Sequence, residues 1–302
     1  MTPLTDTDPP ITMRSELKEL WKFRELLKML VARELKVRYK NSALGFIWSI
    51  IPPLMQVLVF TFLLRNVLGV PAKNFSAYLL SGIIPWTFFS TGIQDASQSV
   101  VINYTMIRKI YLPREAIPLA NVISNGVHFL LGWAVYFVAF LVIAPLFHGG
   151  IPILPTLVFF PFVVVMEALL VTGCALFVAA LNVFYEDVKF ILQTVFNLAF
   201  FIMPVLYPSD QIYYTSSLVQ KHPWIYTLYM LNPIAAFINA FRHFILQPIG
   251  PSAFNQSPRL LGKPALPFDW TTFGGACLIT LFIAWGGYAY FNYRKWQFVE
   301  RP

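Results

Sequence analysis

Residues 17–48 read LKELWKFRELLKMLVARELKVRYKNSALGFIW, and this stretch decides the fold class because a basic amphipathic segment continues directly into a long apolar one. Leucine, valine and tryptophan recur at helical spacing from residue 17 to residue 35, while lysine and arginine fill the remaining face. Such a helix typically lies in the headgroup layer of a membrane. We therefore expect an interfacial helix within residues 17–40 that leads without a linker into the first membrane span.

The composition is that of an integral membrane protein. Of 302 residues, 57% are hydrophobic, 17% aromatic and only 12% charged, which is too apolar for an ordinary soluble domain. The net charge of +8 comes from basic residues beside apolar segments, and this favours anionic lipid over nucleic acid as a partner. Cys174 and Cys277 lie inside apolar segments and indicate no disulfide framework. The charged start of the chain predicts no cleaved leader.

Apolar windows of roughly the 20 residues that a membrane crossing needs occur six times along the chain. They are residues 43–64, 74–94, 116–147, 155–185, 190–208 and 270–293. With both termini in the cytoplasm, 16 of the 22 lysine and arginine residues lie inside, as the positive-inside rule favours. We expect an all-α fold with a cytoplasmic segment, residues 1–42, followed by a six-span domain, residues 43–302.

Residues 222–241 also lack formal charge and present the alternative of a seventh span, which the charge count does not exclude. Asn232 and Pro233, in the middle of this stretch, are typical of a helix cap followed by a first-turn proline. This break predicts two short helices. We therefore expect an outward re-entrant hairpin over about residues 209–250, between spans five and six, followed by an outer loop over residues 250–269.

Two inner loops are candidates for docking a partner. Asn103 is suited to cap a helix over residues 104–112, which Pro113 would end, and this helix carries Arg108 and Lys109. The second inner loop, residues 182–190, carries acidic side chains.

Signatures of catalysis are missing from the sequence. The GxxxxGK[ST] phosphate loop does not occur, so the chain is not expected to hydrolyse ATP by that route or to be an enzyme. The four histidines are far apart and have no carboxylate or cysteine neighbours at metal-ligand spacing. We expect this chain to bind no metal and no cofactor.

Some polar and aromatic residues leave more than one interpretation open. Glu167 lies deep in the fourth window, where it lines a path, forms a buried hydrogen bond to His128 at similar depth, or belongs to a proton relay, which usually needs several such groups. Asp95, at the inner end of its window, favours a structural role. The aromatics of residues 196–229 form either an interfacial belt with core packing or a surface on which sugar rings stack. The basic residues of the amphipathic segment reflect ordinary inside bias or recruit a phosphate-bearing lipid head group.

Six blocks of sequence, taken in order, carry a resemblance to a known family. They are RELKVRYKNSALGFIWSIIPPL (33–54), YLLSGIIPWTFF (78–89), IRKIYLPREAIPL (107–119), NVFYEDVKFILQ (182–193), FFIMPVLYP (200–208) and LNPIAAFINAFRHFIL (231–246). Together they resemble the type-2 ABC transporter permeases that export polysaccharide, O antigen or teichoic acid. Glu186 departs from the pattern, because the family commonly has a basic residue there.

The resemblance implies a homodimer of twelve spans with a conduit at its interface. It also implies two copies of a separate ATP-binding subunit, in which ATP and Mg would bind, and an undecaprenyl-linked polymer moved outward across the bacterial cytoplasmic (inner) membrane. Coupling to the ATP-binding subunit would involve Tyr104, Ile107, Arg108, Lys109, Tyr111, Glu186 and Asp187. The lipid head-group entrance would involve Arg33, Arg38 and Lys40. The conduit or gate would involve Glu167, Phe200, Phe201, Tyr207, Tyr226, Asn232 and Arg242.

The same residues leave other functions to consider. An ABC exporter of another amphiphile fits the same blocks. A secondary transporter predicts repeat symmetry with broken helices in both halves, and the sequence has no such repeat. A membrane-embedded enzyme acting on lipid-linked sugars predicts clustered catalytic groups, whereas Asp210 and Asp269 are isolated along the chain.

Overall fold

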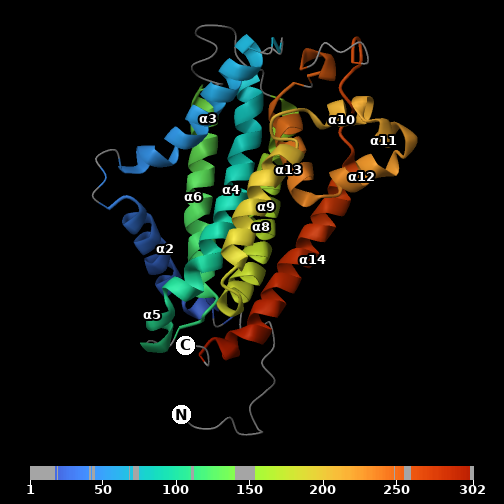
Figure 1. Cartoon of the computed structure of the whole chain (residues 1–302). Helices are drawn as coiled ribbons and strands as arrows, with labels where there is room; N and C mark the ends of the chain where they lie inside the picture. Colours follow the sequence, from blue (N-terminus) through green and yellow to red (C-terminus); the bar gives the residue numbers. More distant parts are fainter. Residues whose placement is uncertain are drawn as a thin grey trace.

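Long helices pack side by side along one axis and form a bundle, with short helices gathered at both ends (Figure 1). The structure is a computed structural model that describes residues 18, 20–40, 42, 45–67, 69–70, 75–109, 112–139, 154–247, 249–254 and 260–299. Every regular element within these residues is a helix. The predicted all-α fold class is therefore confirmed for the described part of the chain.

The amphipathic segment forms α2 (Arg24–Arg38), which packs on α6 (Ala116–Phe137) through an apolar cluster around Leu30. The predicted direct continuation into the first span is wrong. A turn follows at Tyr39, and Gly45 has a φ of 51°, a backbone conformation that favours glycine. This joint separates α2 from the next long helix (Figure 1).

The first apolar window is built from three consecutive helical pieces. They are η1 (Gly45–Ser49), α3 (Ile51–Thr61) and the π-helical η2 (Phe62–Val67). Most of the large side chains of this segment are exposed, which is the arrangement expected of a helix that faces lipid or another protein chain.

The core of the bundle surrounds α4 (Phe75–Ile102), most of whose side chains are buried. It contacts α3, α6, α8 (Phe160–Phe184, preceded by η4, Pro155–Phe159), α9 (Val188–Ile202) and α13 (Pro233–Ile245). The windows at 74–94 and 116–147 correspond to α4 and α6, and residues 140–147 lie outside the described residues. Trp133 lies at the centre of the aromatic part of this core. The distance between ring centroids is 4.9 Å to Phe241 and 5.1 Å to Phe160.

Three helical segments in the described residues are long and apolar enough to cross a membrane: Ile47–Val67, Pro155–Phe184 and Trp270–Phe298. The fifth predicted window coincides with α9, a shorter apolar helix. The sixth coincides with α14 (Trp270–Arg294), which begins where the Asp269 carboxylate accepts hydrogen bonds from the Thr271 and Thr272 amides and continues into η6 (Lys295–Val299).

The backbones of α8 and α14 approach each other closely where the two helices cross. A Cβ atom added to Gly173 would overlap the backbone of Ala284, and one added to Gly287 would overlap the backbone of Gly173. Helix pairs in membranes associate through such small residues because lipid provides no hydrophobic driving force between helices. Gly286, next in sequence to Gly287, has open space around it.

The predicted break at Asn232 and Pro233 is confirmed. The Asn232 side chain accepts a hydrogen bond of 3.2 Å from the Ile234 amide, and α13 starts at Pro233. The chain before the break folds into α10 (Ser209–Thr215), α11 (Ser217–Lys221) and α12 (Trp224–Met230), and η5 (Pro251–Ala253) follows α13. We call this end of the bundle the α12 end.

The opposite end carries α5 (Tyr104–Lys109), the turn between α8 and α9, and η6. Ile107 of α5 packs on the same apolar cluster as Phe184 of α8 and Phe298 of η6. The two ends are seen at the bottom and the top right of Figure 1. We call the end with α5 the α5 end.

The glycine crossing makes a direct prediction. Gly287→Ala should lower the free energy of unfolding by about 1–3 kcal/mol, because the added methyl group overpacks a contact between two backbones. Thermal unfolding of the purified protein in detergent measures the effect. The adjacent Gly286→Ala is the control and should leave the midpoint unchanged, so equal shifts for the two variants would contradict the packing described.

Candidate functional site

At the α5 end, α5 presents one apolar and one basic face. Ile107 is directed into the bundle, whereas Arg108 and Lys109 are exposed, with the Arg108 guanidinium 5.7 Å from the Tyr104 ring centroid. The helix ends before its predicted boundary, because Leu112 is buried in non-helical backbone, and Tyr111 lies outside the described residues. The basic face is available to a partner.

The turn between α8 and α9 places two acidic side chains at the same end. Glu186 and Asp187 are both exposed. Asp187 occupies the N-cap position of α9, yet its carboxylate makes no capping hydrogen bond. The α5 end therefore offers a basic helix and an acidic turn, the two features that the sequence predicts for docking.

The sequence does not predict a buried charge contact that the structure shows at the α5 end. The Lys295 ammonium lies 3.7 Å from the Glu115 carboxylate, and the two side chains are 9% and 2% exposed. The Arg114 guanidinium donates a hydrogen bond to the Lys295 carbonyl. The segment that follows α5 is thus fastened to the end of α14. The partners are 180 positions apart, so no local pattern reveals the contact.

Two arginines of the predicted head-group entrance have partners within the chain. Arg38 pairs with the Asp95 carboxylate at 2.5 Å and donates to the Asn125 amide oxygen at 3.1 Å. Arg33 pairs with Glu34 at 2.6 Å, and it donates to the Asn103 side-chain oxygen at 2.8 Å. The side-chain amide of Asn103 donates to the Ser99 carbonyl, so the residue predicted to cap α5 also connects α4 to α2.

A cavity of about 340 Å³ lies beside Arg38, between the start of α3 and helices α4 and α6. Its walls are mainly apolar, and Tyr39 and His128 lie at its polar side, with the Tyr39 hydroxyl 3.2 Å from the His128 ring. Lys40, the third predicted entrance residue, follows Tyr39 in the sequence, and its side chain is exposed.

Of the three interpretations of Glu167, the hydrogen bond to His128 does not form in the structure. Glu167 is fully buried on α8, and neither of its carboxylate oxygens has a hydrogen-bond partner among the described residues. His128 contacts Tyr39 instead. Similar depth along two spans does not make their side chains face each other, because the rotation of each helix decides that.

Arg242 on α13 fastens the α12 end to the bundle. Its guanidinium donates to the carbonyls of Pro204 and Val205, just beyond the end of α9, and lies 3.7 Å from the Tyr78 ring on α4. A Cβ atom at Gly82 would collide with it. A guanidinium suits this position because its five donors reach several carbonyls at once.

Of the remaining predicted gate residues, some make hydrogen bonds within the fold, one is buried and one is exposed. Tyr207 donates to the Ile202 carbonyl at 2.6 Å and Asn232 caps α13, so both shape the chain around α9 and α13. Phe200 is buried, with its ring 6.1 Å from that of Trp86, whereas Phe201 is 62% exposed. The structure does not gather them into one site.

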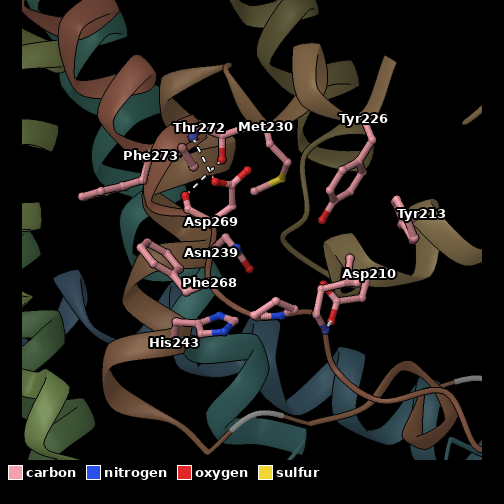
Figure 2. A pocket seen from close by; sticks show the side chains of 13 residues that line it. Asp210, Tyr213, Tyr226, Met230, Asn239, His243, Phe268, Asp269, Thr272 and Phe273 are labelled. Carbon is pink, nitrogen blue, oxygen red and sulfur yellow. Dashed lines mark hydrogen bonds between the residues drawn. The ribbon is translucent and has the colours of Figure 1, made fainter. Parts of the chain in front are cut away.

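Tyr226, the last of the predicted gate residues, lines a second cavity of about 310 Å³ at the α12 end (Figure 2). Asp210 and Asp269, which are isolated along the sequence, line the same cavity. Burial raises the pKa of the Asp210 carboxyl. Hydrogen bonds from Thr271 lower the pKa of the Asp269 carboxyl, which caps α14.

The role of Arg242 is testable. Arg242→Lys should lower the free energy of unfolding by about 1–3 kcal/mol, because lysine keeps the charge but cannot satisfy the same set of carbonyls. Thermal unfolding and protease sensitivity of the α12 end measure the effect. The control is Arg65→Lys at an exposed position. An Arg242→Lys protein as stable as this control would contradict the fastening role.

Comparison with known proteins identifies the family. Residues 25–246 match the family described as ABC-2 type transporter. An O-antigen export system permease protein RfbA of Klebsiella pneumoniae is 31% identical over 225 residues, which cover 74% of this chain and 82% of that protein. A protein of the same name from Myxococcus xanthus is 28% identical over 226 residues, with 75% and 82% covered. A polysialic acid transport protein KpsM of Escherichia coli is 20% identical over 232 residues, with 73% and 81% covered. The chain therefore belongs to the ABC-2 type transporter family.

Proposed function

We propose that this chain is the membrane-spanning subunit of an ATP-driven exporter that moves lipid-linked polysaccharide out of the bacterial cytoplasm. The observation that carries the proposal is the 31% identity to O-antigen export permeases across most of both chains. The six blocks on which the sequence resemblance rests all lie inside the matched residues 25–246. Export of a polymer of this class is therefore the activity to test.

The proposed topology has six spans, formed by α3, α4, α6, α8, α9 and α14. The α5 end would face the cytoplasm together with both termini, and the α12 end would face outward. The excess of basic residues on the α5 side supports this orientation. Residues 1–42 would form the cytoplasmic segment, and α10 to α13 would form the re-entrant outer hairpin.

The α5 end is the proposed docking surface for a separate ATP-binding subunit, in which ATP and Mg would bind. Arg108 and Lys109 offer positive charge and Glu186 and Asp187 offer negative charge, all exposed. A push on α5 would reach the spans directly, because Ile107 packs on the ends of α8 and α14, and Lys295 holds the following segment. ATP-driven closure of the partner would thereby tilt α8 and α14.

Two copies of the chain would enclose the conduit. The exposed apolar side chains of α3 and α9, including Phe201, supply a face suited to a second copy, to lipid or to the passing polymer. The lipid phosphate would enter near α2. A phosphate that reaches Arg38 competes there with Asp95, so substrate arrival would loosen the contact between α2 and α4.

Deletion of the gene tests the proposal. Lipid-linked polysaccharide should accumulate on the cytoplasmic side of the membrane and disappear from the cell surface, and the intact gene on a plasmid should reverse both effects. Gel electrophoresis measures the amount and length of the polymer, and surface labelling shows on which side of the membrane it lies. Unchanged surface polysaccharide in the deletion strain would refute the proposal.

The docking surface makes a second prediction. Arg108→Glu with Lys109→Glu should reduce export strongly while the protein remains in the membrane. The basic face of α5 would bind an acidic surface of the ATP-binding subunit, and the reversed charge would repel that surface. Co-purification of the ATP-binding subunit and its ATPase rate are measured together with export. Lys221→Glu, a charge reversal at an exposed position of the α12 end, is the control. Normal export by the double variant would count against α5 as the docking element.

A further inference from the structure

The cavity at the α12 end has the construction of a small ligand site. Its volume of about 310 Å³ falls at the lower end of the range for small-molecule sites, roughly 300–1,000 Å³. Its walls come from parts of the chain that are distant in sequence: α10, α12, α13, the segment before α14, and α14 itself (Figure 2). Helix ends and a loop thus close around one space.

Polar groups of complementary kinds surround that space. The carboxylates of Asp210 and Asp269 provide acceptors, the side-chain amide of Asn239 provides both a donor and an acceptor, and Figure 2 shows the Tyr226 hydroxyl directed into the cavity. The protein holds these groups in place: Asp210 accepts from the Leu266 amide at 2.9 Å, and Asn239 accepts from the Ser209 hydroxyl at 3.4 Å. The site is preorganised before any ligand arrives.

Aromatic rings form much of the remaining lining. Tyr213 and Tyr226 lie on one side with their ring centroids 5.2 Å apart, and Phe268 and Phe273 lie on the other at 5.3 Å. Aromatic faces bury apolar C–H surfaces, while polar groups between them fix orientation. A ring that carries hydroxyl groups around its edge and C–H groups on its faces matches both features, and a sugar is such a ring.

The charge of the lining restricts the class of sugar. In the part of the chain that the structure describes, no lysine or arginine lines the cavity, and two carboxylates do. Arg242 lies near Asp210 in an adjoining smaller recess, but its donors are directed to backbone carbonyls. His243 also lines the cavity, and burial lowers the pKa of its imidazole. A phosphate or a uronic acid would therefore meet like charge without a permanent cation to offset it. Among the described residues, no group of three or more His, Cys, Asp or Glu side chains is placed to hold a metal.

We infer that this cavity binds one uncharged sugar residue of the exported polymer at the outer face of the membrane. The inference rests on the proposed function, because that function brings a polysaccharide past the α12 end. The site would hold the emerging polysaccharide at the outer hairpin between successive cycles of ATP hydrolysis.

The test uses the purified full-length protein in detergent and a panel of small glycosides. The panel contains the methyl glycosides of glucose, galactose, mannose, rhamnose and N-acetylglucosamine, with glucuronate as the anionic probe. Saturation-transfer NMR and the fluorescence change of Trp270, read against a Trp270→Phe protein, report binding. At least one uncharged glycoside should bind with an affinity in the millimolar range, and glucuronate should bind more weakly.

Two variants locate the binding within the cavity. Asn239→Ala and Tyr226→Phe should each weaken binding by about fivefold, because each removes a hydrogen-bonding group. Tyr214→Phe is the matched control, since the Tyr214 hydroxyl donates to the Pro264 carbonyl and Tyr214 does not line the cavity. Thermal unfolding midpoints close to that of the unmodified protein verify that each variant is folded.

Three outcomes would overturn the inference: no uncharged glycoside binds, glucuronate binds as tightly as the best of them, or both variants bind like the control. The export measurement keeps this failure separate from failure of the proposed function. A chain that restores surface polysaccharide but binds no glycoside leaves the proposed function standing and rejects the site. A chain that binds a glycoside but supports no export keeps the site and rejects the proposed function.

Discussion

The crossing of α8 and α14 at Gly173 and Gly287 is the contact on which the rest of the structure depends. Because two backbones touch there, α14 is held against the core without large interlocking side chains. Its first residues then reach the cavity at the α12 end, and Lys295, the residue directly after its end, reaches Glu115 at the α5 end. One helix fixed in its middle therefore connects the proposed site of energy input with the proposed site of polymer exit.

Charged side chains then attach the peripheral elements to this core. Arg242 satisfies carbonyls beyond α9 where helical hydrogen bonding has ended, Lys295 meets Glu115, and Arg38 meets Asp95. Arg242 is buried, and without its guanidinium the carbonyls of Pro204 and Val205 would lose a hydrogen-bond donor in apolar surroundings, which is costly. Basic residues counted in the predicted orientation thus also attach peripheral segments to the bundle.

Helix caps and apolar windows in the sequence predict the helices well. They do not predict which side chains from distant parts of the chain come into contact. The break at Asn232 and the apolar windows follow from capping and from length, so both were predictable. The pairing of Arg38 with Asp95, 57 positions away, depends on how α2 lies on the bundle. The failed match of Glu167 with His128 has the same origin, since depth in a membrane carries no information on helix rotation. The cavity at the α12 end was missed because its two carboxylates are separated by more than 50 residues.

The attachment of α2 to the bundle depends on the solution that surrounds the protein. Arg38 and Asp95 are 37% and 38% exposed, so water and ions reach their contact. Mobile ions weaken such an exposed pair as the ionic strength rises, whereas the apolar packing of Leu30 on α6 does not depend on charge. The attachment of α2 to the bundle therefore depends in part on the ionic strength of the surrounding solution.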